Sequence, residues 1–256
     1  NDRKASNTKK YRHSLFSVLI QYICIRKMRN PIHVACTIDD NYAQHCAVML
    51  VSLFMNNKEN NFVIHVINNG LKRKNKVRLQ RLIKKYKAID HFYQIDESIL
   101  QNAPITHHIT LATYYRILLP KILPKDLEKI LFLDSDIVVL DDIIALWNTN
   151  IDNYYIAGCC EFPSNERKIR LGMNIDSAYF NAGVILINLN KWRAGNILSK
   201  CLDIINNQKE KIEYWDQDTL NIVFENQWKQ ISHHWNVNHK FYLVPYSFEY
   251  FKISQK

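Results

Sequence analysis

The sequence predicts an α/β domain built on a mainly parallel central sheet flanked by helices. From residue 32 onward, short apolar runs typical of strands alternate with longer amphipathic segments typical of helices, and this alternation favours parallel strands joined by helices. Acidic residues directly follow two of the apolar runs, Asp39 after the first and Asp134 after a later one. Ligands of such sheets bind at the carboxyl ends of the strands, so these acids indicate where a site is expected.

The first half of the chain supplies three predicted strands and three predicted helices. The strands are expected at residues 33–38, 62–67 and 91–95. The helices are expected at 42–55, at 71–86 and at about 110–118, where Pro120 is expected to end the helix. Nine Lys and Arg residues lie between positions 72 and 87. They predict a solvated face or, as the alternative, a surface for a membrane or another anionic partner.

The stretch KILFLDSDIVVLDD at residues 129–142 organises the second half of the chain. Its apolar run at 130–133 predicts a strand buried on both faces, and the run ends at Asp134, Ser135 and Asp136. Carboxylates two positions apart on an extended chain project to one side, where they repel each other unless a cation lies between them. Two interpretations stay open: a Mg²⁺ or Mn²⁺ site that holds a phosphate, and a polar strand end whose acids cap a turn.

The rest of the chain continues the alternation. Strands are expected at 155–160 and 184–189, and helices at 192–207 and 216–225. The chain has only five glycines, and no two lie within ten positions of each other, which excludes a glycine-rich dinucleotide or phosphate loop. The six cysteines form no Cys-x-x-Cys pair. They predict free thiols in a reducing compartment.

The positive charge is concentrated at the amino terminus. Of the formal net charge of +10, residues 1–31 carry +7, from eight Lys and Arg against Asp2, so nucleic-acid binding by the whole protein is not expected. The apolar segment 15–25 is shorter than the ~20 residues needed to span a bilayer. It predicts either contact with an anionic membrane surface or a leader that packs on the domain or is disordered. We expect a basic extension at 1–31 and a single domain at 32–256.

Several motifs occur together in a fixed order. They are TIDDNY at 37–42, TYYR at 113–116, LFLDSD at 131–136, YFNAGV at 179–184, NLNKW at 188–192 and DQD at 216–218. This set resembles the family 8 retaining glycosyltransferases, above all the bacterial lipopolysaccharide galactosyl- and glucosyltransferases, over roughly residues 32–250. The resemblance implies a GT-A fold, a UDP-hexose donor, a glycan or glycolipid acceptor at the cytoplasmic membrane face, and Mn²⁺ or Mg²⁺ bridging the diphosphate to Asp134 and Asp136.

The resemblance also implies roles for single residues. Uridine contacts are implied for Thr37, Asp39 and Asn41, and an acceptor contact for His108. Arg116 is implied to bind the donor phosphate or sugar, although a structural ion pair is the alternative. The other implied donor contacts are Asp134, Ser135, Asp136, Asn181, Ala182, Gly183, Asp216 and Gln217. The segment 181–183 is expected to form a turn before a strand, and the alternative for Asp216 is a plain helix cap.

The last pair, Asp216 and Gln217, is the expected catalytic pair. Retention of the anomeric configuration by double displacement needs a carboxylate nucleophile. Gln217 has an amide side chain, which is a poor nucleophile. We therefore expect front-side return, with Asp216 binding sugar hydroxyls and the departing phosphate taking the acceptor proton.

The sequence departs from the family at its carboxyl end. A His-x-x-Gly-x-x-Lys-Pro-Trp-like segment, which holds a third metal ligand in the family, is absent before Lys256. We expect a truncated or shortened member, with His233, His234 and His239 structural or solvent-facing. The alternatives are a UDP-sugar-binding protein without turnover, an aspartyl-phosphate phosphatase with Asp134 as nucleophile, and a self-glucosylating enzyme.

Overall fold

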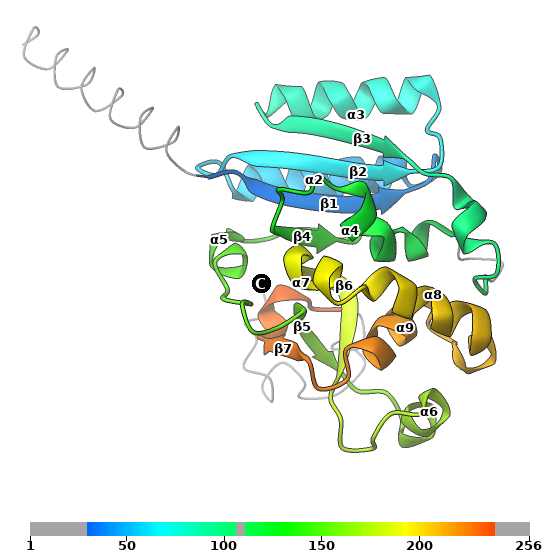
Figure 1. The fold of residues 1–256 in the computed structure, drawn as a ribbon. Coiled ribbons are helices and arrows are strands. Elements are labelled where there is room, and N and C mark those ends of the chain that lie inside the picture. Colours follow the sequence, from blue (N-terminus) through cyan, green and yellow to red (C-terminus); the bar gives the residue numbers. More distant parts are fainter. Residues whose placement is uncertain (1–29, 106–110, 239–256) are drawn as a thin grey trace, which may run out of the picture.

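The computed structural model describes residues 30–105 and 111–238, which form a seven-stranded sheet covered by helices (Figure 1). The strand order is β3-β2-β1-β4-β6-β5-β7. The strands are β1 (Ile32–Ile38), β2 (Phe62–Asn68), β3 (Ile89–Gln94), β4 (Lys129–Leu133), β5 (Ile156–Glu161), β6 (Tyr179–Asn188) and β7 (Trp228–Ile231). All neighbouring pairs are parallel except those made by β6, which runs antiparallel to β4 and β5. The predicted fold class is confirmed.

Helices cover both faces of the sheet. On one face, α2 (Ala43–Asn56) and α3 (Arg73–Lys85) pack on apolar side chains of β1 and β2. On the other face lie the 3₁₀ helix η2 (Leu111–Leu118) and α7 (Leu189–Ala194), α8 (Ile197–Asn207) and α9 (Trp215–Val223). The remaining helical segments are η1 (Glu97–Leu100), α4 (Leu119–Ile122), α5 (Ile144–Trp147), α6 (Asn165–Leu171), η3 (Lys209–Lys211) and η4 (His233–Trp235). Burial on both faces explains the near-continuous apolar runs of β1, β2 and β4.

The structure corrects the expected end of the helix before β4. Pro120 does not terminate the helical region, because it lies in the first turn of α4, directly after η2. A proline fits there since the first turn of a helix leaves its backbone N–H groups unpaired. The long helix expected at 192–207 is divided in two at Asn196, whose φ is +50°.

A second correction concerns Asn181, Ala182 and Gly183. They do not form a turn before a strand but lie inside β6, which begins at Tyr179. The register of β5 against β6 shifts at this point, so that Gly158 pairs with Ile185 while Cys159 pairs with Asn181. The shift leaves residues 182–184 of β6 without a partner on β5, and such a bulge-like irregularity bends a strand and redirects its side chains. This irregularity explains how a segment with the turn-like residues Asn181 and Gly183 can lie inside a strand.

Several expectations fall on residues outside the described ranges. They include the basic extension up to residue 29, and also His108 and His239. Within the described ranges the cysteines are free thiols, as expected, with the sulfurs of Cys36 and Cys46 3.6 Å apart. No helix in these ranges has the length and apolar character required to traverse a bilayer.

Candidate active site

A cavity of about 240 Å³ opens at the carboxyl ends of β1 and β4. Its walls come from these strand ends, the middle of η2, the bulged part of β6 and the start of α9. Of the residues expected at a donor site, the cavity brings together Thr37, Asp39, Arg116, Asp134, Ser135, Asp136, Asn181, Ala182, Gly183, Asp216 and Gln217. Asn41 is exposed and does not line it.

Arg116 is the centre of the cavity wall. Its Nη2 donates to Asp134 Oδ1 at 2.8 Å, and its Nη1 donates to the carbonyl oxygen of Ala182. Its guanidinium carbon lies 4.3 Å from the centre of the Phe132 ring, while Nε is 2.7 Å from Asp216 Oδ2. Burial disfavours the charged guanidinium, but the nearby carboxylates outweigh this effect and raise the pKa of Arg116. One buried cation therefore joins η2, β4, β6 and α9.

Asp216 is the most unusual carboxylate of the cavity. Its residue is only 2% exposed, and among the described residues its Oδ2 is the buried side-chain oxygen without a hydrogen bond. The ion-pair contact with Arg116 does not satisfy this oxygen, because Arg116 Nε–H donates to the Thr113 carbonyl instead. Burial raises the pKa of Asp216 to about 7, against the opposing attraction of Arg116. A buried acceptor without a hydrogen bond is costly, so this carboxylate is suited to a donor supplied by a ligand.

The acid pair of the central strand lies at the mouth of the cavity. β4 ends at Leu133, and Ser135 and Asp136 form a turn, so the pair does not continue an extended strand as expected. Burial raises the pKa of Asp134, with Arg116 opposing, while Asp136 is exposed. A Cβ atom at Gly183 would stand 2.8 Å from Asp134 Oδ2. Only glycine leaves room for that carboxylate.

The acid pair is also the candidate metal site. No group of three His, Cys, Asp or Glu side chains within 30–105 and 111–238 is arranged to hold a metal ion. The chain thus offers two carboxylates at this point. Magnesium-type ions are commonly held by one or two carboxylates with substrate phosphates and water completing the shell, and this donor set fits that pattern.

Asp39 has a structural role within the site. Its Oδ1 accepts hydrogen bonds from the backbone N–H groups of Asn41 at 2.9 Å and Tyr42 at 3.0 Å, which orders the turn between β1 and α2.

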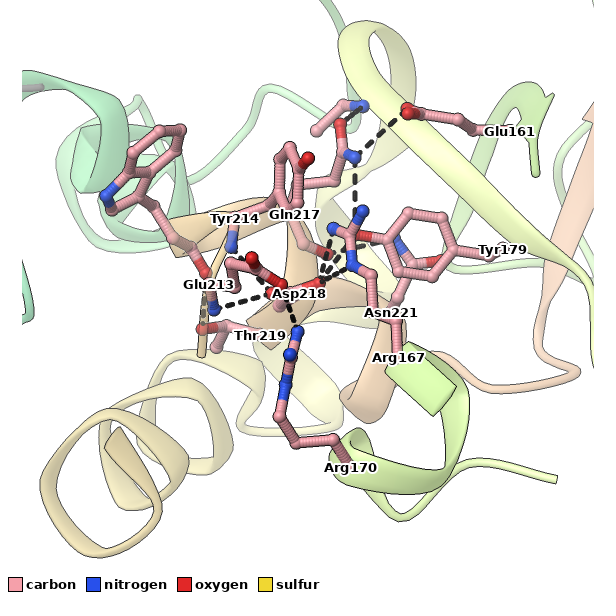
Figure 2. A network of polar contacts seen from close by, with 12 residues as sticks. Glu161, Arg167, Arg170, Tyr179, Glu213, Tyr214, Gln217, Asp218, Thr219 and Asn221 are labelled. Atoms are coloured by element: carbon pink, nitrogen blue, oxygen red, sulfur yellow. Dashed lines mark hydrogen bonds and ion pairs between the residues drawn. The ribbon is translucent and has the colours of Figure 1, made fainter. Parts of the chain in front are cut away.

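A second polar network adjoins the cavity, because Tyr214 and Gln217 belong to the network and also line the cavity (Figure 2). Asp218 is fully buried; its Oδ1 accepts from Arg167 Nη2 at 2.7 Å and Tyr179 Oη at 2.8 Å. Its Oδ2 accepts from the backbone N–H groups of Glu213 at 2.9 Å and Tyr214 at 2.7 Å. This carboxylate thus fixes the segment that leads into α9 and the cavity wall.

Gln217 is held by the same region. Its Oε1 accepts from the Ala182 backbone N–H at 3.0 Å, and its Nε2 donates to Glu161 Oε2 at 3.1 Å and to Tyr179 Oη at 3.2 Å. Hydrogen bonds to β5 and β6 therefore fix the position of the Gln217 amide. The sequence singled out neither Glu161 nor Arg167, because they lie in no motif; Arg167 belongs to α6, a helix that was not predicted.

The three histidines near the carboxyl end were expected to be structural or solvent-facing. His233 is buried, and its Nε2 lies 3.0 Å from the carbonyl oxygen of Cys160. His234 is more exposed and lies 3.6 Å from Asp141 Oδ2. For these two residues the positions agree with the expectation.

The fold is that of solved GT-A glycosyltransferases. The galactosyltransferase LgtC, solved in complex with donor and acceptor sugar analogs, superposes with a TM-score of 0.81 at 24% identity, over 88% of this chain and 84% of that one. The bifunctional glycosyltransferase WbbM superposes with a TM-score of 0.69 over 88% of this chain and 45% of its own. Residues 33–254 match the model of glycosyl transferase family 8. The chain belongs to this family, as its motifs indicated.

Three relatives match more than three quarters of this chain. General stress protein A of Bacillus subtilis is 32% identical over 209 residues, 80% of this chain and 73% of its own length. A lipopolysaccharide 1,2-glucosyltransferase of Escherichia coli and a lipopolysaccharide 1,3-galactosyltransferase of Salmonella typhimurium are each 30% identical over 77% of this chain. The chain spans only 59% and 61% of these two enzymes.

Proposed function

We propose that the protein transfers glucose or galactose from a UDP-hexose to a lipopolysaccharide, lipooligosaccharide or related glycan acceptor, with retention of the anomeric configuration. The observation that carries this proposal is the buried carboxylate of Asp216, which lines the cavity beside Arg116 and whose Oδ2 accepts no hydrogen bond among the described residues. A sugar hydroxyl is a donor of the right kind and size for this oxygen. A hexose held there lies next to the acid pair of β4.

The other donor contacts follow from the cavity walls. Thr37 and Asp39 line the end near α2, where we place the uridine, with Asn41 at its outer edge. Arg116 supplies positive charge for the diphosphate. The bulged segment of Asn181, Ala182 and Gly183 brings backbone close to the sugar, and Ser135 completes the floor. His108 is proposed to contact the acceptor.

Asp134 and Asp136 are the residues that would hold Mn²⁺ or Mg²⁺ together with the donor diphosphate. When bound, the ion supplies Lewis-acid stabilisation of the charge that develops on the UDP leaving group. Two neighbouring residues position the Asp134 carboxylate before the reaction begins. Arg116 fixes the Asp134 carboxylate through Oδ1, and Gly183 leaves space beside Oδ2.

Transfer is proposed to occur on one face of the sugar. The bond from the anomeric carbon to the UDP oxygen breaks while a bond to the acceptor oxygen forms on the same side. The acceptor hydroxyl proton passes to the departing phosphate oxygen. Gln217 is committed to Glu161, Tyr179 and the Ala182 amide, so it orients the sugar rather than attacking it.

Ionisation of Asp216 makes the proposed reaction pH-dependent. The pKa of Asp216 is raised to about 7, far above the ordinary carboxyl value, so the group is largely protonated at pH 6 and becomes an acceptor above pH 7. We expect kcat/KM for the donor to rise about tenfold from pH 6 to pH 8, because this ratio reports the ionisation of the free enzyme. Steady-state rates of donor hydrolysis across pH 5.5–8.5 measure it. A flat or falling profile contradicts the role of Asp216.

Calorimetric titration of UDP tests the donor site. We expect binding that Mn²⁺ strengthens at least about tenfold, and we expect the Asp134→Asn/Asp136→Asn variant to lose this gain, because neutral amides are poor ligands for hard cations. The matched control is Asp152→Asn/Asp176→Asn, which neutralises two exposed acids outside the cavity and should bind as the native chain does. Binding that is equal in both variants refutes the metal assignment.

A hydrolysis screen of UDP-glucose against UDP-galactose then identifies the sugar. Binding of UDP without hydrolysis or transfer of either donor indicates the alternative function, a UDP-sugar-binding protein without turnover.

A further inference from the structure

A second groove lies on the face of the protein covered by α2 and α3. It has a volume of about 870 Å³ and lies between these two helices and residues 138–140. Four aliphatic side chains of this groove are strongly exposed: Val48 at 58%, Met55 at 55%, Val138 at 58% and Leu140 at 61%. Single exposed apolar residues are ordinary, but four around one groove mark an interaction surface.

A stripe of positive charge borders this groove. Lys74, Arg78, Arg81 and Lys85 follow each other at spacings of four, three and four residues, which places them on one face of α3. All four are exposed, whereas Leu79 and Ile83 point to the core. Arg78 is part of both the stripe and the groove.

The charge of this face is not neutralised within the described chain. Residues 72–87 contain nine Lys and Arg and no acid. In the ranges that the structure describes, the ion pair recorded for this segment joins Lys72 to Asp40, and the nearby Asp90 accepts a hydrogen bond from Gln80. Among the described residues the four residues of the stripe form no ion pair, although Lys85 Nζ lies 5.8 Å from the centre of the Tyr86 ring, so their positive charge is available to an external partner.

The groove adjoins the sugar cavity. Tyr42 lines the cavity and Ala43 lines the groove, and on the other side Asp136 lines the cavity while Val138 lines the groove. α3 begins beside the same point, because Lys72 N and Asn75 Nδ2 both donate to Asp40 Oδ1. A flat partner on this face lies next to the cavity rim.

We propose that the groove and the stripe dock the protein on a membrane rich in anionic phospholipids. The stripe contacts the headgroups, and the exposed aliphatic side chains enter the boundary of the acyl region. Basic residues beside an anionic surface and aliphatic side chains at the acyl boundary are the two contributions that hold peripheral proteins on a bilayer. The proposal does not depend on the transfer reaction, and it uses α3 rather than the amino-terminal extension.

Lipid fits this surface better than nucleic acid does. Proteins that track single strands combine positive charge with aromatic side chains on which bases stack. The exposed apolar residues of the groove are aliphatic instead. They offer no stacking platform but suit an acyl environment.

Vesicle co-sedimentation of the full chain tests the proposal. We expect binding to vesicles of phosphatidylcholine and phosphatidylglycerol at a ratio of about 7:3, and little binding to phosphatidylcholine alone. The variant Lys74→Glu/Arg81→Glu/Lys85→Glu should bind the anionic vesicles at least about tenfold more weakly. The variant with Gln at the same three positions should show an intermediate loss; it keeps the test valid if charge reversal disturbs the fold.

The matched control carries the same charge change elsewhere. Lys121→Glu/Lys125→Glu/Lys200→Glu alters exposed lysines of α4, its following loop and α8, so its net charge equals that of the stripe variant. Its vesicle affinity should stay within about twofold of the native chain. A further variant, Val138→Ser/Leu140→Ser, leaves the charge unchanged and should weaken vesicle binding severalfold.

The outcomes separate clearly. Unchanged vesicle binding by the stripe variant overturns the proposal, because the amino-terminal extension is then sufficient. Equal losses in the stripe and control variants also overturn it, since bulk charge would be responsible. Loss of binding to a 20-nucleotide single strand, with vesicle binding retained, assigns the surface to nucleic acid. UDP binding measured on each variant should remain native, which separates failure of this proposal from failure of the proposed function.

Discussion

Replacing Arg116 with methionine is expected to abolish turnover and to destabilise the fold by about 3–5 kcal/mol, because removal of one partner leaves buried carboxylates uncompensated. Asp134 and Asp216 both lose their cation, and the carbonyl of Ala182 loses its donor. Methionine matches much of the removed volume, so the loss reports charge and hydrogen bonds rather than a large cavity. Urea unfolding and donor hydrolysis measure the two effects.

The pH dependence of this loss follows from Asp216. Its carboxyl already has a pKa of about 7 in the native protein, and removal of Arg116 favours the neutral form further. At pH 6 the group is protonated and needs no cation, so the variant should be closer to native stability there than at pH 8. The control is Arg116→Lys, which keeps the charge but not the guanidinium contacts, so it should lose turnover while its loss of stability depends less on pH than that of the methionine variant. If the methionine variant loses the same unfolding free energy, relative to the native chain, at pH 6 and at pH 8, the raised pKa assigned to Asp216 is contradicted.

Breaking the buried pair next to the cavity is expected to have the second largest effect. Arg167 and Asp218 are both buried and joined at 2.7 Å, and the guanidinium carbon of Arg167 lies 3.6 Å from the centre of the Tyr214 ring. Arg167→Met should therefore cost about 3–5 kcal/mol of unfolding free energy. A structural role alone would leave kcat/KM intact, whereas we expect it to fall at least about tenfold, since Tyr214 and Gln217 move with the network.

The same helix provides a control for this experiment. Arg170 lies one turn along α6 and pairs with Glu213, but both side chains are about half exposed (Figure 2). Arg170→Met should cost no more than about 1 kcal/mol, because exposed pairs contribute little. In a double-mutant cycle, the variant that combines Arg167→Met with Asp218→Asn should lose much less unfolding free energy than the sum of the losses of the two single variants. Additive losses would show that the two side chains do not act together.

The fold and most of the cavity are readable from local patterns. Apolar runs placed β1, β2 and β4, and acids at strand ends marked the cavity edge, because strands buried on both faces leave a strong periodic signal. Asp39 and Asp134 occur at such ends. These features depend on residues that are close in sequence.

The parts that sequence reasoning missed depend on distant contacts. Whether Gly183 lies in a turn or a strand is decided by the bulge opposite Gly158 and Cys159, and nothing near position 183 encodes that register. Arg167 is marked by no motif, and its importance arises only when α6 meets Asp218 from 51 residues away. Buried ion pairs of this kind are formed by tertiary structure, so they leave no periodic trace.

The position of β4 has a consequence for how the chain folds. β1, β2 and β3 are consecutive both in sequence and in the sheet, whereas β4 pairs with β1 on one side and with β6, some 50 residues later, on the other. Pairings between distant segments form slowly, because the entropy of closing a long loop is lost before the new contacts stabilise the chain. The contacts of Arg116 are also distant in sequence, because Asp134 lies 18 residues and Ala182 lies 66 residues further along the chain. We therefore expect the amino-terminal strands to order early and the cavity to be among the last parts of the domain to assemble, so that a nascent chain completes its cavity only after its second half has docked.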